Sequence, residues 1–525
     1  MVFVRKVKTS SGATAVQVAQ REAGRDKIIK HIGSAHTPDE LALLVLEAKK
    51  HIQGGQLAFD LDDLAGTGIG SAVAESHASR LLWQVLEDAW QAYGFASVIP
   101  DEAFKQLVLA RLIKPTSKLA TVATLEALGI QACSVRSYYR SLQRASERDY
   151  RSLVESACVG WAMGRGDMSL LLYDVTTLYF EAENEDTEES RTVKRRVGVS
   201  KERRVDPQIV VGLLVDRAGN PLRVRAYSGN QAEKNTIVPL VKAFMDEHDL
   251  SDFVVVADAG MLSRANLLAL EEAGIRFIVG ARQTRAPLDL ESHYRWHGDT
   301  YSDGQVIDTL TPRHANSRVN DPTVRAEPVW EESMSGSWRA VWQYTRRRWV
   351  RDMHTLKAQR NRAMSIINGD TRPKNTRFVQ QRGGQLVFNQ AVWERAVAVA
   401  GLKGYVTNIP ASLMPASEVI ASYHDLWHVE QSFRMSKTDL KARPIFHHSE
   451  QAIEAHLTIV IAALALSRYL HTTTGITVPK IVRALEPLKD TIIRMPDGRR
   501  IPVTTAIPPH AQDIIDTIKR SELTH

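Results

Sequence analysis

The 525-residue sequence predicts a multidomain α/β protein. The length accommodates about two to four domains, each large enough for a hydrophobic core of its own. From residue 169 to residue 282, strand-like and helix-like patterns follow in the order strand, strand, strand, helix, strand, helix, strand. This mixed order is typical of an α/β unit, and a long helical region precedes it.

The composition is that of a soluble globular protein, with 44% hydrophobic and 24% charged residues. An excess of 67 basic over 60 acidic residues gives a net charge of +7, a mild preference for polyanionic partners. The two cysteines, Cys133 and Cys158, cannot form a disulfide framework or a multi-cysteine zinc site, which fits a reducing cytoplasm. No signal peptide begins the sequence, and the apolar run 457–466 is shorter than the ~20 residues of a membrane span.

The N-terminal third divides into two predicted parts. Residues 1–65 predict a β-hairpin followed by a helix from residue 37 to about residue 51, and residues 66–165 predict a wholly helical region. Within it, Arg136, Arg140 and Arg144 recur every four residues and form a basic stripe. Such a stripe could lie along a phosphate backbone, and a solvated helix face is an equally open reading.

Residues 166–284 predict the first part of the α/β core. A strand whose most apolar part ends on Asp174 is followed by a hairpin over 207–230 and a helix over 233–248. A second apolar strand ends on Asp258. The next helix is expected to begin after the N-cap Ser263 and to end before Gly274, ahead of a further strand.

Residues 285–401 have a different character, with many polar residues, six tryptophans and short β-like runs. They predict a β-rich insertion domain that also carries a basic helix over 351–367. Residues 402–480 predict the second part of the core: a strand, one helix over 417–441, and a long apolar helix over 453–469 that packs on the sheet. Residues 481–525 predict a hairpin around Pro496-Asp497-Gly498 and a last helix.

One helix carries an unusual set of side chains. Tyr423, Trp427, Glu430, Arg434 and Lys437 follow one another at steps of four, three, four and three residues. At about 100° per residue they share one face of a helix. Two aromatic rings, one acid and two bases do not suit a core stripe. They suit a helix that brings a carboxylate to a metal ion and a cation to a phosphate.

Two further carboxylates complete a candidate metal site. Asp174 and Asp258 each end an apolar stretch of strand, where a carboxylate is held rigidly at the edge of a sheet. An aspartate there is more commonly a turn or capping residue, but Lys437 on the face of Glu430 favours a site. Mg²⁺ prefers oxygen ligands, and two ions about 3.5–4 Å apart stabilise both oxygens of a phosphoryl displacement.

These residues resemble the YREK signature of DDE insertion-sequence transposases, in the branch with a β-rich insertion before the glutamate. Tyr423, Glu430 and Lys437 match the signature, whereas Leu426 stands where it has an arginine. Further stretches with this resemblance are residues 174–180, 198–216, 227–230, 254–263, 404–408 and the run that ends at 448. The resemblance covers roughly residues 70–480.

The resemblance implies an RNase H-like mixed sheet core, interrupted by the β-rich insertion and preceded by a helical DNA-binding region. Asp174, Asp258 and Glu430 are implied to be the catalytic residues and to bind two Mg²⁺ ions, for which Mn²⁺ could substitute. Tyr423 and Lys437 are implied to contact DNA phosphate. Trp427 and Arg434 share their face and are expected to contact nucleic acid, with Arg434 supplying the cation that Leu426 does not.

The function implied is that of the DNA transposase of a bacterial insertion sequence, an endonuclease and strand transferase of a transposable element. It would nick the element ends and join the freed 3′-hydroxyl to target DNA in DNA recombination. The implied partners are double-stranded DNA (terminal inverted repeats and target) and a second copy of the chain on paired ends, with no membrane partner. The expected location is the cytoplasm, at the nucleoid.

Four alternatives stay open. His424 and His428 imitate the zinc-binding HExxH motif of metalloproteases, with the shorter Asp425 in the place of the glutamate. An aspartyl-phosphate phosphatase would use Asp174 as a nucleophile. An RNase H-fold nuclease would use the same three carboxylates. A DNA-binding relative of a transposase would keep the fold without catalysis.

Overall fold

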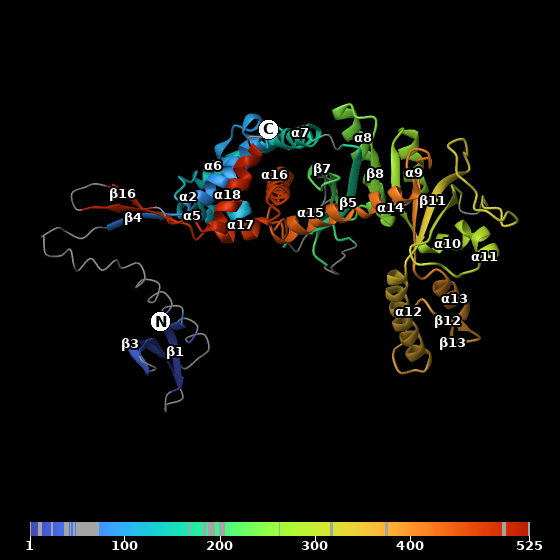
Figure 1. Ribbon diagram of the computed structural model, residues 1–525, viewed down its shortest axis with the longest axis horizontal. Helices are drawn as coiled ribbons and strands as arrows, with labels where there is room; N and C mark the ends of the chain where they lie inside the picture. The colour runs from blue at the N-terminus through green and yellow to red at the C-terminus, as the bar shows by residue number, and fades with distance from the viewer. Residues whose placement is uncertain are drawn as a thin grey trace. The chain divides into compact units, whose positions relative to one another are not determined.

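The computed structural model describes residues 2–8, 13–22, 25–35, 73–165, 168–181, 185–186, 195–198, 205–261, 263–314, 319–372, 376–495, 500–503 and 505–522, and four positions between 41 and 48. The chain divides into two compact units. The first is formed by Met1–Glu75 and Ile492–Pro502, the second by Ser76–Thr491 and Val503–His525. The elements of both are labelled in Figure 1.

The first unit contains an antiparallel sheet of the order β1-β2-β3, formed by β1 (Val2–Lys8), β2 (Thr14–Glu22) and β3 (Arg25–Ala35). The sequence predicted only a hairpin and missed β3. That strand does not alternate polar and apolar residues, and its Ile28 and Ile29 are both about half exposed. Backbone pairing with β2 forms β3 without such a pattern. The predicted helix is present at the described residues Leu41, Leu44, Val45 and Ala48.

The second unit is built on an eight-stranded sheet of the order β10-β11-β14-β9-β8-β5-β6-β7. Its strands are β5 (Leu170–Tyr179), β6 (Gln208–Asp216), β7 (Pro221–Ser228), β8 (Val254–Ala257), β9 (Arg276–Ala281), β10 (Val306–Pro312), β11 (Ser337–Tyr344) and β14 (Leu402–Thr407). β5, β6 and β7 pair antiparallel, whereas β5, β8 and β9 pair parallel. The five strands β5 to β9 therefore stand in the RNase H-like order three-two-one-four-five.

Two helices, α8 (Ile237–His248) and α9 (Arg264–Glu272), cover one face of this sheet. The Ser263 side chain caps α9 by accepting a hydrogen bond from the Asn266 amide, and Gly274 follows the helix with φ 72°. The left-handed conformation favours glycine at that position. The predicted β6–β7 hairpin and both ends of α9 are thus confirmed.

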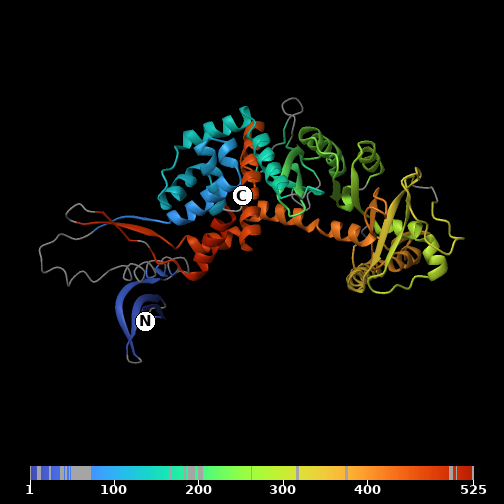
Figure 2. The ribbon, with the colours of Figure 1, turned by 45° about the horizontal axis from the view of Figure 1, so that its top comes forward.

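The opposite face is covered by α14 (Ala416–His424), α15 (Trp427–Thr438) and α16 (Glu450–Thr474). α16 contacts β7, as the sequence predicted, and also lies among α2 (Arg80–Ala92), α4 (Glu102–Ile113), α6 (Val135–Glu147) and α7 (Tyr150–Gly164). Figure 2 shows the orange-red α16 between these blue helices and the green strands. One continuous core therefore joins the helical region to the sheet.

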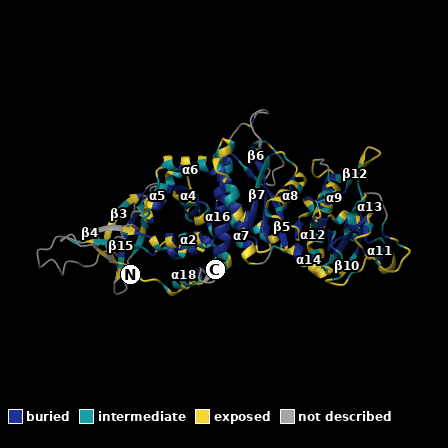
Figure 3. Ribbon diagram, turned by 90° about the horizontal axis from the view of Figure 1, so that it is seen from above, coloured by how far each residue is buried: buried dark blue, intermediate teal, exposed yellow. Residues whose placement is uncertain are grey.

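α16 is also the one described helix that is long and apolar enough to cross a bilayer. Its 25 residues extend well beyond the run 457–466 that the sequence analysis considered too short. Within its most apolar window, 94% of the residues are buried inside the protein, as Figure 3 shows in dark blue. That burial is typical of a core helix.

Shorter helices complete the helical region: α3 (Phe95–Val98), α5 (Lys118–Ala127), α17 (Val478–Leu485) and α18 (Pro509–Glu522). The region is not wholly helical, because β4 (Val73–Ala78) lies within it. β4 belongs to a third sheet of the order β16-β15-β4, with β15 (Asp490–Arg494) and β16 (Arg500–Val503). The predicted turn at Pro496-Asp497-Gly498 lies outside the described residues.

The inserted residues 285–401 add two strands to the main sheet and also form a separate two-stranded sheet. β10 and β11 extend the main sheet beyond β14, and Trp338 and Trp342 are buried in its core. The remainder has its own small core between α12 (Arg346–Ile367), β12 (Val379–Arg382), β13 (Gln385–Phe388) and α13 (Gln390–Ala398), which lie together in Figure 1. Two short helices, α10 (Ala286–Asp289) and α11 (Glu291–His297), precede β10.

Candidate active site

Asp174 and Asp258 occupy adjacent positions on neighbouring parallel strands. The last paired residues of β5 and β8 are Tyr173 and Ala257, and each aspartate comes next in its chain. Neighbouring strands are about 4.8 Å apart, so the register brings the two carboxylates together. Asp174 does not end its strand as predicted, because pairing with β6 continues as far as Tyr179.

The two aspartates also point to the same face of the sheet. Leu172 on β5 and Val256 on β8 face the core beneath α14, α15 and α16. Side chains alternate along a strand, so the residues two positions further, Asp174 and Asp258, lie on that face too. Asp174 is half-buried and Asp258 is exposed, which leaves this edge of the sheet open to solvent.

The predicted helix over 417–441 is two helices, α14 and α15, that meet at Asp425 and Leu426. At the junction the Leu426 amide donates to the Tyr423 carbonyl, and the His428 amide donates to the Asp425 carbonyl. These i to i−3 bonds are tighter than α-helical ones and interrupt the helix. Glu430 is nevertheless exposed on α15, with Trp427, Arg434 and the half-buried Lys437.

Tyr423 connects these helices to the aspartates. Its hydroxyl donates a hydrogen bond of 2.7 Å to Oδ1 of Asp258 and accepts one of 3.2 Å from Nζ of Lys403. Its ring packs edge-on against Tyr405, with ring centroids 4.9 Å apart. A Cβ at Gly280 would lie 2.6 Å from the hydroxyl, so only glycine leaves room for this tyrosine.

The charges that act on Tyr423 include that of Glu430. Burial raises the pKa of the Tyr423 hydroxyl, and the negative charges of Asp258 and Glu430 raise it further. Burial also lowers the pKa of Lys403. Asp258 opposes that shift, whereas Arg348 and Arg351 of α12 reinforce it. The site therefore combines carboxylates from β8 and α15 with cations from β14 and α12.

Leu426 and Lys403 explain where the cation of this site lies. Leu426, at the arginine position of the signature, is only 5% exposed and belongs to the core between α15 and the sheet. An arginine side chain at this position would begin inside that core. Lys403 supplies positive charge beside Asp258 instead. The sequence analysis missed Lys403, although a lysine within an otherwise buried strand was a usable signal.

The predicted basic stripe on α6 is only partly available to a ligand. Arg136 and Arg140 are exposed. Arg144 instead forms an ion pair with Asp101, with its Nη2 2.7 Å from Oδ2 of the carboxylate. Asp101 also caps α4 and accepts a hydrogen bond from Ser141, so Arg144 belongs to a structural network. The expectation that Arg144 binds nucleic acid is not supported by its position.

A second cationic surface lies between α4, α5 and the run 440–448. Nζ of Lys118 is 3.1 Å from Nε2 of His447 and lies over the exposed ring of Tyr139. Burial and the positive charge of Arg111 together lower the pKa of Lys118 to about 8. Burial and the charges of Lys118 and Arg111 lower the pKa of His447 to about 4. The described residues that line this pocket include no carboxylate. An anion would relieve the unfavourable positive charge.

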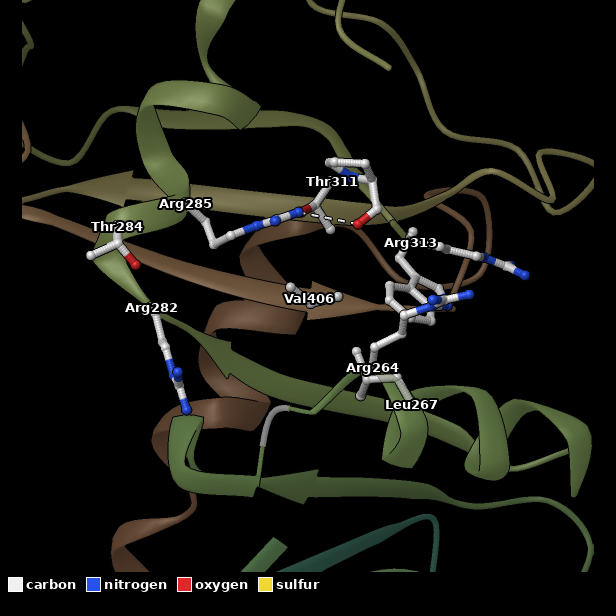
Figure 4. A pocket seen from close by; sticks show the side chains of 10 residues that line it. Arg264, Leu267, Arg282, Thr284, Arg285, Thr311, Arg313 and Val406 are labelled. Atoms are coloured by element: carbon white, nitrogen blue, oxygen red, sulfur yellow. Dashed lines mark hydrogen bonds between the residues drawn. The ribbon is translucent and has the colours of Figure 1, made fainter. Parts of the chain in front are cut away.

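The face of the sheet that α8 and α9 cover carries a pocket with four arginines, shown in Figure 4. Arg285 donates to Thr311, and Arg313 pairs with Glu271 at 2.7 Å. Arg264 and Arg282 are exposed, and neither side chain forms a hydrogen bond or ion pair within the described ranges. Leu267, Trp338 and Val406 add apolar lining. These arginines were not predicted from the sequence, because they come from three separate segments that only the fold brings together.

The zinc-protease alternative has no support in the described part of the chain. His424 ends α14 and His428 lies in α15, so the two are not on one continuous helix. Among the described residues, neither belongs to a cluster of three potential metal ligands. His428 instead lies beside Arg468, and burial followed by this positive charge lowers its pKa.

An RNase H-like sheet with carboxylates on adjacent strands defines an enzyme of the class that transfers phosphoryl groups of nucleic acids. Residues 166–466, more than half of the chain, match the family model of the transposase DDE domain, and the chain belongs to that family. It is a DDE transposase, an enzyme of DNA transposition. Members of the family use divalent metal ions. The assignment decides against the protease and phosphatase alternatives.

Two solved structures are similar to the chain at low sequence identity. The piggyBac transposase synaptic complex with hairpin DNA shares 9% identity over 79% of this chain and 82% of that one, with a TM-score of 0.40. The Mos1 transposase paired-end complex with the left transposon end shares 10% identity over 31% of this chain and 59% of that one, with a TM-score of 0.16. No curated protein matches the chain.

Proposed function

We propose that this transposase binds two Mg²⁺ ions through Asp174, Asp258 and Glu430, cleaves the ends of its mobile element and joins them to target DNA. The observation that carries the proposal is the register of β5 and β8, which makes the two aspartates neighbours. The ligands are all carboxylate oxygens, which suits Mg²⁺ and allows Mn²⁺ to substitute. When bound, the ions supply charge stabilisation to the attacking and leaving oxygens of a phosphoryl displacement.

The surrounding side chains have positioning and binding roles in this proposal. Tyr423 fixes the orientation of Asp258 through its hydrogen bond. Lys403 provides the positive charge that Leu426 cannot. Lys437, Arg434 and Trp427, on the face of α15 that carries Glu430, are then available to the DNA strand next to the cleaved phosphate.

Duplex DNA is the proposed partner, as terminal inverted repeat and as target. Arg136 and Arg140 on α6, the carboxylate-free pocket around Lys118 and the basic helix α12 support binding to phosphates. The helical region 66–165 would hold the repeats, with α12 assisting. We further propose a homodimer on paired ends, located at the nucleoid in the cytoplasm of a bacterium. The homodimer and the location are inferred from the transposase function, and neither rests on a contact between subunits.

The decisive experiment uses the DNA that flanks the gene as substrate. A labelled duplex with the terminal inverted repeat is incubated with the protein and Mg²⁺, and nicked and joined products are separated. We expect Asp174→Asn, Asp258→Asn and Glu430→Gln each to reduce cleavage by at least about 10³-fold. DNA binding should persist in all three variants. Asp425→Asn is the matched control, because Asp425 is a carboxylate beside α15 that pairs with Arg217.

The opposite outcome would be equally clear. If the unaltered protein binds the repeats without cleaving them in Mg²⁺ or Mn²⁺, the chain is a DNA-binding relative without catalysis. If cleavage occurs without strand transfer, the nuclease alternative is correct. If Asp258→Asn cleaves as fast as the unaltered protein, the carboxylates do not form the active site.

A further inference from the structure

Three potential metal ligands gather around α11, outside the catalytic carboxylates. His293 and His297 are four residues apart on this helix, and Glu327 comes from the segment before β11. One ligand atom of each residue lies within 4.8 Å of those of the other two. Two histidines at i and i+4 share a helix face, which is a common way to present two nitrogens to one ion.

His293 is held beside Glu327 by its surroundings. The residue is only 3% exposed, and its ring stacks on Tyr301 with centroids 5.6 Å apart. Nδ1 is 2.7 Å from Oε1 of Glu327. Nε2 is buried and has no hydrogen-bond partner within the described residues. The two ring nitrogens point in different directions, so Nδ1 is the one that can share an ion with Glu327.

A simple hydrogen bond between His293 and Glu327 does not account for the whole arrangement. It gives no reason for the nearby His297 ring, whose centroid is 5.0 Å from that of His293. His297 is exposed and Glu327 is half-buried, so both can move. Ligand atoms around a tetrahedral Zn²⁺ are roughly 3.3 Å apart, given Zn–N and Zn–O distances of about 2.0 Å. Small side-chain rotations would therefore complete the site.

We propose that His293, His297 and Glu327 bind one Zn²⁺ ion, with a fourth position open to solvent. Two imidazoles and one carboxylate form the mixed nitrogen and oxygen set that suits Zn²⁺, unlike the all-oxygen set of the catalytic carboxylates. The ion fastens α11 to the segment around residue 327. That segment already touches the helix, since the Ser292 hydroxyl donates to the Val324 carbonyl at 2.7 Å. The site does not depend on the proposed function.

The test titrates the full-length protein with Zn²⁺ against a chromophoric chelator, in excess Mg²⁺ so that the catalytic carboxylates do not compete. We expect one equivalent to bind. His297→Gln and Glu327→Gln should weaken binding by at least about 100-fold, the upper end of the cost of losing an outer-shell partner. His354→Gln is the matched control, because His354 is exposed on α12. Co²⁺ in place of Zn²⁺ should give the visible absorption of a tetrahedral site.

A second readout separates ion binding from misfolding. Zn²⁺ should raise the Tm of the unaltered protein and of His354→Gln, but not that of His297→Gln or Glu327→Gln. Without zinc, the circular dichroism spectra of all four proteins should be the same. The proposal is overturned if the unaltered protein binds no equivalent of Zn²⁺ under these conditions. It is overturned too if both ligand variants bind Zn²⁺ as tightly as the unaltered protein.

Discussion

The Tyr423 hydroxyl donates a 2.7 Å hydrogen bond to Oδ1 of Asp258, and this contact joins α14 to the end of β8. The two residues are 165 positions apart in the chain. A short tyrosine bond to a carboxylate at a strand end holds that carboxylate in one orientation, which a metal-binding group needs. The buried ring of Tyr423 is in turn held by Tyr405 and by the space at Gly280.

Tyr423→Phe should therefore slow DNA cleavage without unfolding the protein. The ring would keep its packing, and Asp258 would lose a hydrogen bond worth about 1.5–3 kcal/mol, as for bonds to charged groups. We expect cleavage to fall by about 10- to 100-fold, with a higher Mg²⁺ concentration needed for half-maximal rate. Tyr227→Phe, which removes a hydroxyl bonded to the Thr236 carbonyl, is the control. An unchanged Mg²⁺ dependence would show that the bond does not orient the carboxylate.

Lys118 should make the stability of the free protein depend on pH. Its pKa in the folded protein is about 8, below its ordinary value, mainly because it is buried. The unfolded chain therefore binds more protons between about pH 8 and 10, and the free energy of unfolding rises with pH across this window. We expect a rise of roughly 2–3 kcal/mol that Lys118→Met lacks, measured by urea denaturation. Bound DNA should remove most of this rise in the free energy of unfolding, because its phosphates stabilise the charged lysine. An equal rise in Lys118→Met would assign the effect to other groups.

Asp289 should have the opposite pH dependence. Burial raises its pKa to about 7. Its Oδ2 accepts a 3.1 Å hydrogen bond from the Trp342 indole, and Oδ1 is buried without a partner within the described residues. The folded protein binds the extra proton between about pH 4 and 7, so stability falls as the pH rises through this range. Asp289→Asn should be more stable than the unaltered protein at pH 8, by about 2–4 kcal/mol, and similar at pH 4.

Denaturant titrations at the two pH values measure this difference. Asp246→Asn, on the exposed side of α8, is the control and should change stability little at either pH. A variant Asp289→Asn that is less stable at pH 8 would mean that the ionised carboxylate is well accommodated in the core.

The pocket of Figure 4 should contribute to DNA affinity through its two unpaired arginines. The plot of log K against log salt has a negative slope. If Arg264 and Arg282 each contact a phosphate, the double substitution to alanine should make this slope less steep by about 1.8. Fluorescence anisotropy at several salt concentrations measures this slope. Arg295→Ala with Arg325→Ala is the matched control, because both guanidinium groups lie over Trp296. A slope that does not change would exclude DNA from the pocket.

Local patterns were enough to predict the order of strands and helices in the core. Ser263 and Gly274 marked the ends of α9 correctly, because capping depends on residues close in the chain. The pairing of β11 with β14 was not predictable, since it joins residues 58 (402 minus 344) to 68 (407 minus 339) positions apart. Lys403 was missed for the same reason: its meaning comes from Tyr423 and Asp258, which only the fold brings near.

The position of α16 has a consequence for synthesis on the ribosome. The core of the helical region closes around a helix that begins at residue 450, although α2 to α7 have been made by residue 164. A chain released early would lack the centre of both the helical region and its junction with the sheet. We therefore expect premature termination to yield no folded helical region that could bind DNA without cutting it.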